Sequence, residues 1–188
     1  LKGKARKGWK AGVDGRLISA GNMKLLESAM KSAGAGLNLK ADLITPVWKD
    51  RPSLPAGEAF ELDVKYAGLT RKDKLEKVRE VMAGMKTDYQ LLTATDDVMW
   101  LLNLRGSDVK YCPLLLSFAI VSRDQVIFFA DEEKIPRQVK ASLDADGVVL
   151  LPYNTVSSVL SHLEEGSVLM LSPSTTSAAL YRSVARKV

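Results

Sequence analysis

The stretch Asp96-Asp97-Val98-Met99-Trp100-Leu101-Leu102-Asn103-Leu104-Arg105-Gly106-Ser107-Asp108-Val109-Lys110-Tyr111 combines capping, apolar and turn-forming residues more densely than any other part of the sequence. Asp96 and Asp97 are predicted to cap a short helix, because a side-chain oxygen can accept the unpaired amide protons of a first helical turn. The bulky apolar residues of this helix then give it a surface to bury; they are Val98, Trp100, Leu101 and Leu102.

A polar turn follows these apolar residues. Gly106 is expected where the backbone needs a positive φ, which residues with a Cβ resist. Arg105 carries five donors and no acceptor, so inside a fold it needs a carboxylate or carbonyl partner. Asp108 is the nearest carboxylate in the sequence. Asp108 is therefore the nearest candidate for that partner.

Regular patterns flank the stretch on both sides. Upstream, apolar residues at helical spacing predict a helix over 71–85 that Thr70 caps, followed by a buried strand over 89–93. Downstream, two strongly apolar runs separated by a polar turn predict a β-hairpin over 114–130.

The last third of the sequence alternates between helical and strand patterns. The expected helices span 132–143, 155–163 and 174–186, and Asp131 is expected to cap the first of them. The expected strands span 147–151 and 168–171. Alternation of this kind predicts an α/β fold, and the hairpin makes its sheet mixed. We therefore expect a mixed sheet flanked by helices.

The first fifty residues repeat part of this pattern. A short strand and its exit are expected within 9–19, then a helix over 21–33 with Asn22 as a plausible cap, then a strand over 37–39. A single strand–helix–strand unit cannot bury its own face. Three prolines and a glycine between residues 46 and 57 then indicate a linker, placed at 51–66, with little regular structure.

Composition narrows the functional classes. Hydrophobic residues make up 46% of the 188 and charged residues 26%, as in ordinary globular proteins, and no apolar run reaches the roughly 20 residues of a membrane span. The net charge of +5 is local: Lys2, Lys4, Arg6, Lys7 and Lys10 lie in the first ten residues. We interpret them as a solvated segment, so neither nucleic acid nor membrane is an expected partner. The single cysteine, Cys112, is predicted to be a buried thiol in a reducing, cytoplasmic compartment.

Catalytic chemistry finds little support in this sequence. A hydrolytic metal site needs clustered carboxylate and imidazole ligands. His162 is the only histidine and is expected at a helix surface or end. Asp144 and Asp146 are predicted to be turn residues rather than a paired acid and base. No catalytic or metal-binding residue is therefore assigned.

Several of these segments resemble the Xaa-Pro aminopeptidases of the three-domain, eukaryotic type. The resemblance rests on residues 100–108 with Tyr111 and Pro113, on 47–55, which resembles the junction of the first two domains, and on 66–79, which resembles the start of the second. It implies the creatinase amino-terminal fold. Residues 1–50 would then be the carboxy-terminal remnant of a first such domain, 51–66 a Pro-rich linker and 67–188 a complete second domain, with the catalytic domain absent.

The resemblance also implies a function for the whole enzyme. Such an enzyme is a metallopeptidase that removes the first residue from peptides with proline second, using two manganese ions in its catalytic domain. The amino-terminal domains would wall the active-site cleft and support a homodimer, so the expected partners are the chain's own catalytic domain and the peptide substrate. The family's metal ligands match no residue here, so the fragment itself is expected to be inactive.

Two interpretations of the central stretch remain open. Trp100, Asn103, Arg105 and Asp108 could line the mouth of the catalytic cleft, or Arg105 could pair internally while Trp100 belongs to the core. A different class of function is also open: a peptide- or protein-binding module that self-associates through unpaired strand edges, with exchange of residues 1–45 as one route.

Overall fold

The chain forms two compact units. The computed structural model describes residues 4–184. Unit 1 contains the described residues up to Ser53 together with Pro173–Ser183, and unit 2 contains Leu54–Ser172 and Val184. Among these residues no helix is long and apolar enough to span a bilayer.

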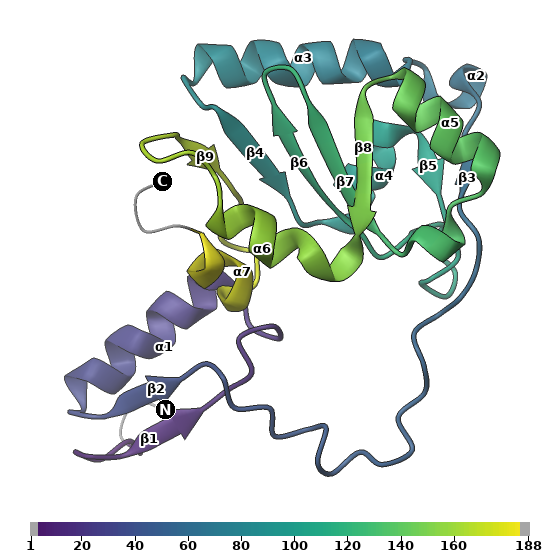
Figure 1. Cartoon of the computed structure of the whole chain (residues 1–188). Helices are drawn as coiled ribbons and strands as arrows, with labels where there is room; N and C mark the ends of the chain where they lie inside the picture. Colours follow the sequence, from purple (N-terminus) through teal and green to yellow (C-terminus); the bar gives the residue numbers. More distant parts are fainter. Residues whose placement is uncertain (1–3, 185–188) are drawn as a thin grey trace. The chain divides into compact units, whose positions relative to one another are not determined.

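Unit 2 is built on a five-stranded mixed sheet with the strand order β8-β7-β6-β4-β9. Figure 1 shows these strands side by side. β6 pairs antiparallel with both β4 and β7, whereas β8 runs parallel to β7 and β9 runs parallel to β4. The predicted mixed α/β fold is confirmed. The strands are β4 (Tyr89–Leu92), β6 (Phe118–Ser122), β7 (Val126–Ala130), β8 (Val148–Pro152) and β9 (Leu169–Met170).

Helices connect these strands, and a second small sheet lies beside them. β3 (Phe60–Glu61) and β5 (Leu104–Arg105) form an antiparallel pair. The α-helices of unit 2 are α2 (Val64–Ala67), α3 (Arg71–Gly84), α4 (Thr95–Leu102), α5 (Arg137–Ala145) and α6 (Val156–Ser161), and its 3₁₀ helices are η1 (Glu132–Lys134) and η2 (Tyr153–Thr155). β3 and α2 fall within or next to the predicted linker, so that part of the chain is more regular than its prolines suggested.

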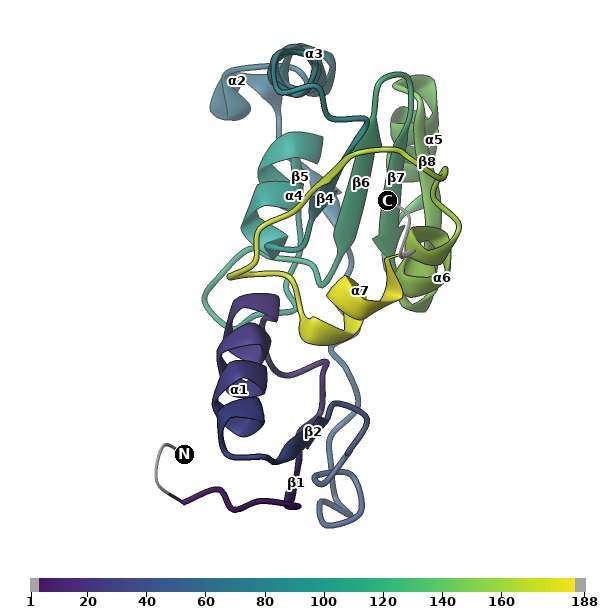
Figure 2. The same ribbon diagram turned by 90° about the vertical axis from the view of Figure 1, so that its left-hand side faces the viewer.

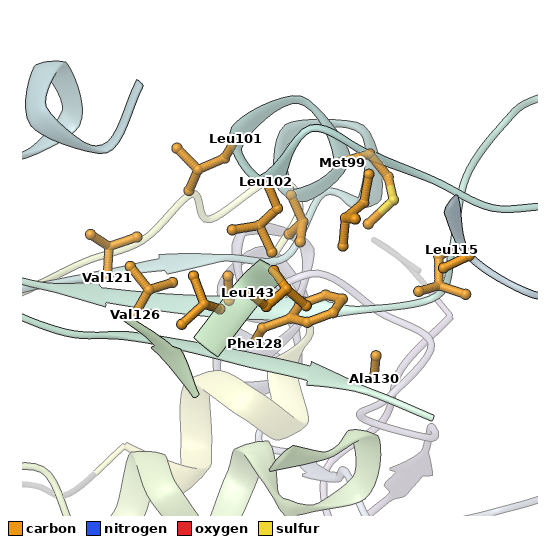
Figure 3. Packing of buried hydrophobic residues seen from close by; sticks show 14 of the residues in the cluster. Met99, Leu101, Leu102, Leu115, Val121, Val126, Phe128, Ala130 and Leu143 are labelled. Carbon is orange, nitrogen blue, oxygen red and sulfur yellow. The ribbon is translucent and has the colours of Figure 1, made fainter. Parts of the chain in front are cut away.

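The core of unit 2 lies on one face of the large sheet. Side chains alternate along a strand, so Val121, Val126 and Phe128 share a face. Apolar residues of α3, α4 and α5 pack against that face, and Figure 3 shows Leu101 and Leu102 of α4 pointing toward it. α6 lies on the opposite side of the sheet from α4 (Figure 2).

Local chemistry explains where the helices of unit 2 begin. Thr70 caps α3 as predicted, and Asp73 completes a capping box because its side chain accepts the Thr70 backbone N–H. Asp131 caps η1 as predicted, but the helix expected over 132–143 is interrupted. Pro136 lies between η1 and α5 in an extended conformation, since proline cannot donate the helical hydrogen bond.

Unit 1 is much smaller and more open. Its parallel strands β1 (Lys10–Gly12) and β2 (Gly36–Asn38) flank α1 (Ala20–Ser32), and α7 (Ala178–Ser183) returns to the same unit. Ser19, rather than the predicted Asn22, caps α1, because the Ser19 hydroxyl accepts the Asn22 backbone N–H. The predicted elements are otherwise present: α1 and β2 have the expected lengths but begin one residue earlier, and β1 is shorter than expected.

The units divide the chain differently from the predicted domains at one place. The break between Ser53 and Leu54 lies close to the expected boundary, but residues 173–183 belong to unit 1. Backbone hydrogen bonds explain this grouping: Ala20 donates to Thr176, Gly21 to Pro173, and Ala178 to Ile18. A final helix expected over 174–186 is present only as α7, and residues 185 and 186 lie outside the described part of the chain, as does Lys2.

Candidate functional site

Helix α4 ends at a residue with left-handed backbone geometry. Asn103 has φ 52° and ψ 36°, and its backbone N–H returns to the last turn of the helix. Asparagine tolerates this conformation better than most residues with a Cβ. The sequence prediction that Gly106 would supply the positive φ is wrong. Gly106 is required for a different reason, since a Cβ there would lie 2.8 Å from the Leu115 Cβ.

Three cations bind the carbonyl groups at the end of α4. Arg105 Nη1 donates to the Met99 carbonyl at 3.1 Å, Lys74 Nζ to Trp100 at 2.8 Å and Arg71 Nε to Leu102 at 3.0 Å. The last four carbonyls of a helix have no partner inside it and carry partial negative charge. The cations therefore satisfy these groups and fix the end of α4 in place.

Arg71 connects this helix end to two other elements. Its guanidinium is 4% exposed and also binds Glu61 Oε1 and Asp146 Oδ2, each at 2.5 Å. Glu61 lies on β3 and Asp146 follows α5. Asp146, predicted only as a turn residue, is thus half of a partly buried ion pair. Its partner lies 75 positions earlier, so nothing local in the sequence signals the pairing.

Lys74 holds both Asn103 and Trp100. Its ammonium donates to Asn103 Oδ1 at 2.6 Å and lies 4.6 Å from the centre of the Trp100 ring. Asn103 in turn donates to the Leu69 carbonyl at 2.9 Å. Burial, together with the nearby positive charge of Arg105, lowers the pKa of Lys74. Lys74 was not among the predicted site residues, because a lysine in a charged helix is usually solvated.

Trp100 is the only one of the four predicted residues with a largely accessible side chain. It is 49% exposed, whereas Asn103 is buried and Arg105 is partly buried. The expectation that Trp100 belongs to the core is therefore wrong; Met99, which that prediction passed over, is buried instead. The structure presents one face of an indole ring whose helix is fixed by buried polar contacts.

Asp108 pairs with Lys134 and not with Arg105. The Asp108 side chain is 0% exposed, and both of its oxygens lie 3.0 Å from Lys134 Nζ. Asp108 Oδ2 also accepts the Leu116 backbone N–H at 2.8 Å. The candidate Arg105–Asp108 pair does not form: Arg105 binds backbone carbonyls, the other kind of partner that the sequence allowed, while Lys134 reaches Asp108 from η1. This buried ion pair anchors the base of the next loop.

Residues 109–112 form an exposed turn, which we call the tip loop. Val109 and Cys112 make a β-bridge, and Tyr111 between them has φ 65° and is 92% exposed. Cys112 is exposed as well, so the predicted buried thiol is wrong. The strand expected from residue 114 begins only at Phe118 as β6, so Cys112 lies outside the sheet.

The acidic residues at the start of α4 do not cap it. Ala94 occupies the cap position without a side-chain hydrogen bond, and Asp96 and Asp97 lie in the first turn. Carboxylates in the first turn are still stabilised by the positive end of the helix dipole. Burial and the neighbouring charge of Asp96 raise the pKa of Asp97.

Potential metal ligands are scattered. Within residues 4–184 no group of three or more His, Cys, Asp or Glu side chains is placed to hold a metal ion. His162 lies at the end of α6, where Nδ1 is 2.8 Å from the Ser158 carbonyl oxygen. These residues do not fit a metal centre, so no chemical step is assigned to one here.

Comparison with known proteins identifies the family. A model of the creatinase/prolidase N-terminal domain matches residues 50–188, and this chain belongs to that family. The related proteins are named as aminopeptidases. The chain is 36% identical over 154 residues to a probable Xaa-Pro aminopeptidase P of Laccaria bicolor, and 33% identical over 185 residues to Xaa-Pro aminopeptidase 1 of Dictyostelium discoideum.

A solved structure agrees with this assignment. The X-prolyl aminopeptidase of Caenorhabditis elegans, described as a cytosolic enzyme with a di-nuclear active site, superposes with a TM-score of 0.91 at 31% identity. The match covers 97% of this chain and 31% of that protein. The two curated relatives are matched over 81% and 93% of this chain but only 24% and 29% of their own length. The chain thus spans about a quarter of the proteins it resembles.

Proposed function

We propose that this chain is the non-catalytic amino-terminal portion of a metallo-aminopeptidase that removes the first residue from peptides with proline second. The observation that carries the proposal is the match to Xaa-Pro aminopeptidases over 81% to 93% of the chain. In this proposal residues 1–50 are the end of a first creatinase-like domain, 51–66 a linker and 67–188 a second domain. The catalytic domain, with two manganese ions, follows.

The same proposal includes a cytoplasmic location and a homodimeric enzyme. The description of the C. elegans neighbour as cytosolic and di-nuclear supports the location and the two-metal centre. The dimer rests on the resemblance to the family alone. The partners of this portion are then its own catalytic domain and the peptide substrate.

Within this portion, Trp100 is proposed as the residue that lines the cleft. Its ring is exposed, and Lys74 and Asn103 stabilise the helix end that carries it. Asn103, Arg105 and Asp108 are positioning residues, because backbone carbonyls, Lys74 and Lys134 already occupy their polar groups. Tryptophan has a large rigid surface that binds peptide at little cost in conformational entropy.

Peptide hydrolysis tests both the aminopeptidase function of the full-length protein and the non-catalytic role of this portion. The 188-residue chain and the full-length protein are compared with added manganese, on a short peptide with proline second and one with alanine second. We expect cleavage only by the full-length protein and only of the proline peptide. Cleavage by the 188-residue chain would refute its non-catalytic role.

Variants of the full-length protein then test Trp100. Trp100→Ala should lower kcat/KM by about tenfold, which corresponds to a lost stacking contact of ~1.4 kcal/mol. The control is Val81→Ala on α3, another exposed apolar residue, which should leave kcat/KM unchanged. An unchanged kcat/KM in Trp100→Ala would remove Trp100 from the cleft but leave the peptidase assignment intact.

A second candidate function is self-association through unit 1. Its sheet has only two strands among residues 4–184, so each strand has one edge without a sheet neighbour there. Exposed strand edges recruit other strands. A monomer at all concentrations in sedimentation would argue against this candidate.

A further inference from the structure

The tip loop at residues 109–112 combines strain with exposure. Tyr111 has φ 65°, a conformation that bulky side chains rarely adopt, and its ring is 92% exposed. Strained residues persist only where the surrounding structure determines them, and they gather at functional sites.

The base of the loop shows what maintains this conformation. Asp108 N–H donates to the Leu114 carbonyl at 2.9 Å and Gly106 N–H to the Pro113 carbonyl at 3.2 Å. Asp108 also forms the buried ion pair with Lys134. A Cβ on Gly57 would clash with Ser107, so the backbone at Gly57 also packs closely against the base of the loop. The loop is therefore preformed and not a flexible excursion.

The chemistry of the tip defines what could bind it. The Lys110 ammonium lies 5.0 Å from the centre of the Tyr111 ring, and Val109 beside them is 37% exposed. An aromatic ring, an aliphatic side chain and a cation together fit an apolar depression bordered by carboxylates. Such a surface would exclude water from the ring and pair with the ammonium.

We propose that the tip loop is a preformed docking element for the polypeptide that follows residue 188. The relatives are more than three times as long as this chain, since 154 of its residues cover 24% of one and 185 cover 29% of another. That leaves a large body of protein to receive the tip. This inference rests on the proposed function only in requiring that such a downstream region exists.

The reactivity of Cys112 measures docking, because Cys112 is the chain's one cysteine and lies exposed in the tip loop. Its rate of reaction with a maleimide is followed by mass spectrometry of the Cys112 peptide, in the 188-residue chain and in the full-length protein. Docking should slow the reaction at least about tenfold in the full-length protein, since a covered thiol reacts only through local opening. Equal rates in the two proteins would overturn the proposal.

Tyr111→Ala in the full-length protein should restore most of the lost reactivity, and Tyr111→Phe should preserve the protection. Tyr66→Ala is a matched control, because Tyr66 is 73% exposed and carries Lys65 4.8 Å from its ring centre. It should leave Cys112 protected. Persistent protection in Tyr111→Ala would overturn the role of the ring, provided that the variant of the 188-residue chain retains its melting temperature.

A second copy of the chain is the competing occupant. If it covers the tip, Cys112 of the 188-residue chain will already be protected and will become reactive on dilution, which would refute docking downstream. Because the readout is independent of catalysis, its failure is distinguishable from a failure of the proposed peptidase function.

Discussion

The two units start from similar strand–helix–strand patterns but differ in how they bury apolar surface. Unit 2 encloses a cluster built from three helices and one face of a five-stranded sheet. Unit 1 has a two-stranded parallel sheet, and its large exposed apolar side chains outnumber the buried ones. The exposed ones are Trp9, Leu17, Leu25, Leu43, Ile44, Val47 and Trp48; the buried ones are Ala20, Met23, Met30, Ala178 and Leu180.

This difference shows that the local pattern alone does not make a stable unit. Parallel strands normally belong to sheets that are covered on both faces. In unit 2, helices lie on both sides of the sheet, α4 on one and α6 on the other, and the unit also buries ion pairs. Unit 1 keeps its charged pairs at the surface, so equivalent changes in the two units should have unequal effects.

The largest expected contrast concerns the ion pairs. Asp108→Ala should lower the free energy of unfolding of unit 2 by ~3–5 kcal/mol, because it leaves the Lys134 ammonium buried without a partner. Arg16→Ala in unit 1 removes an ion pair with Asp14 whose arginine is 66% exposed, and should cost less than ~1 kcal/mol.

Urea denaturation measures both effects. Trp100 reports on unit 2 in a Trp9→Phe/Trp48→Phe background, and circular dichroism reports on the whole chain. The double variant Asp108→Ala/Lys134→Met should recover most of the lost stability, since no buried charge then remains. If Asp108→Ala and Arg16→Ala lowered the free energy of unfolding equally, the ion pairs of the two units would not differ in their contribution to stability.

An intermediate contrast concerns the helix caps. Thr70→Ala removes the capping box of α3, and Ser19→Ala removes the cap of α1; each should cost about 1 kcal/mol. Hydrogen exchange locates the loss. We expect Ser19→Ala to raise exchange rates only within unit 1, while Thr70→Ala should raise them throughout unit 2. If either variant accelerated exchange in both units alike, the units would unfold as one.

The smallest effect is a pH dependence in unit 1. Asp42 accepts hydrogen bonds from the backbone N–H groups of Ile44 and Thr45 and from the Thr45 hydroxyl, and these lower its pKa to about 2. A lowered carboxyl pKa stabilises the fold above the unfolded value of about 4, and the contribution disappears as the pH falls toward 2.

NMR of the Thr45 amide follows this titration directly. Its midpoint should lie near the pKa of Asp42, about 2, and the Asp42→Asn variant should show none. A midpoint near 4 would mean that the turn at residues 42–45 does not hold its hydrogen bonds in solution.

The sequence predicted the fold more successfully than the site. Apolar periodicity and a good cap located α3, and the polar turn located the β6–β7 hairpin, because those signals are local. Pro136 interrupted a predicted helix although its effect was also local; the prediction over 132–143 did not take it into account.

The contacts of the candidate site could not be predicted in this way. Arg71 binds Asp146 across 75 positions, and Lys134 binds Asp108 across 26, so the choice of partner depends on the folded arrangement. Arg105 has a carboxylate three residues away but binds helix carbonyls instead. Proximity in sequence is a poor guide wherever several cations compete for buried acceptors.

The return of residues 173–183 to unit 1 has a consequence during translation. Strand β1 and helix α1 leave the ribosome early, but α7 is made only after residues 54–172 of unit 2. At 5–20 residues per second, the interval is on the order of ten seconds. During that time the carbonyl of Ile18 and the amides of Ala20 and Gly21 lack their final partners. The nascent first unit therefore presents unfinished backbone and apolar surface, on which chaperones can act, until unit 2 has been completed.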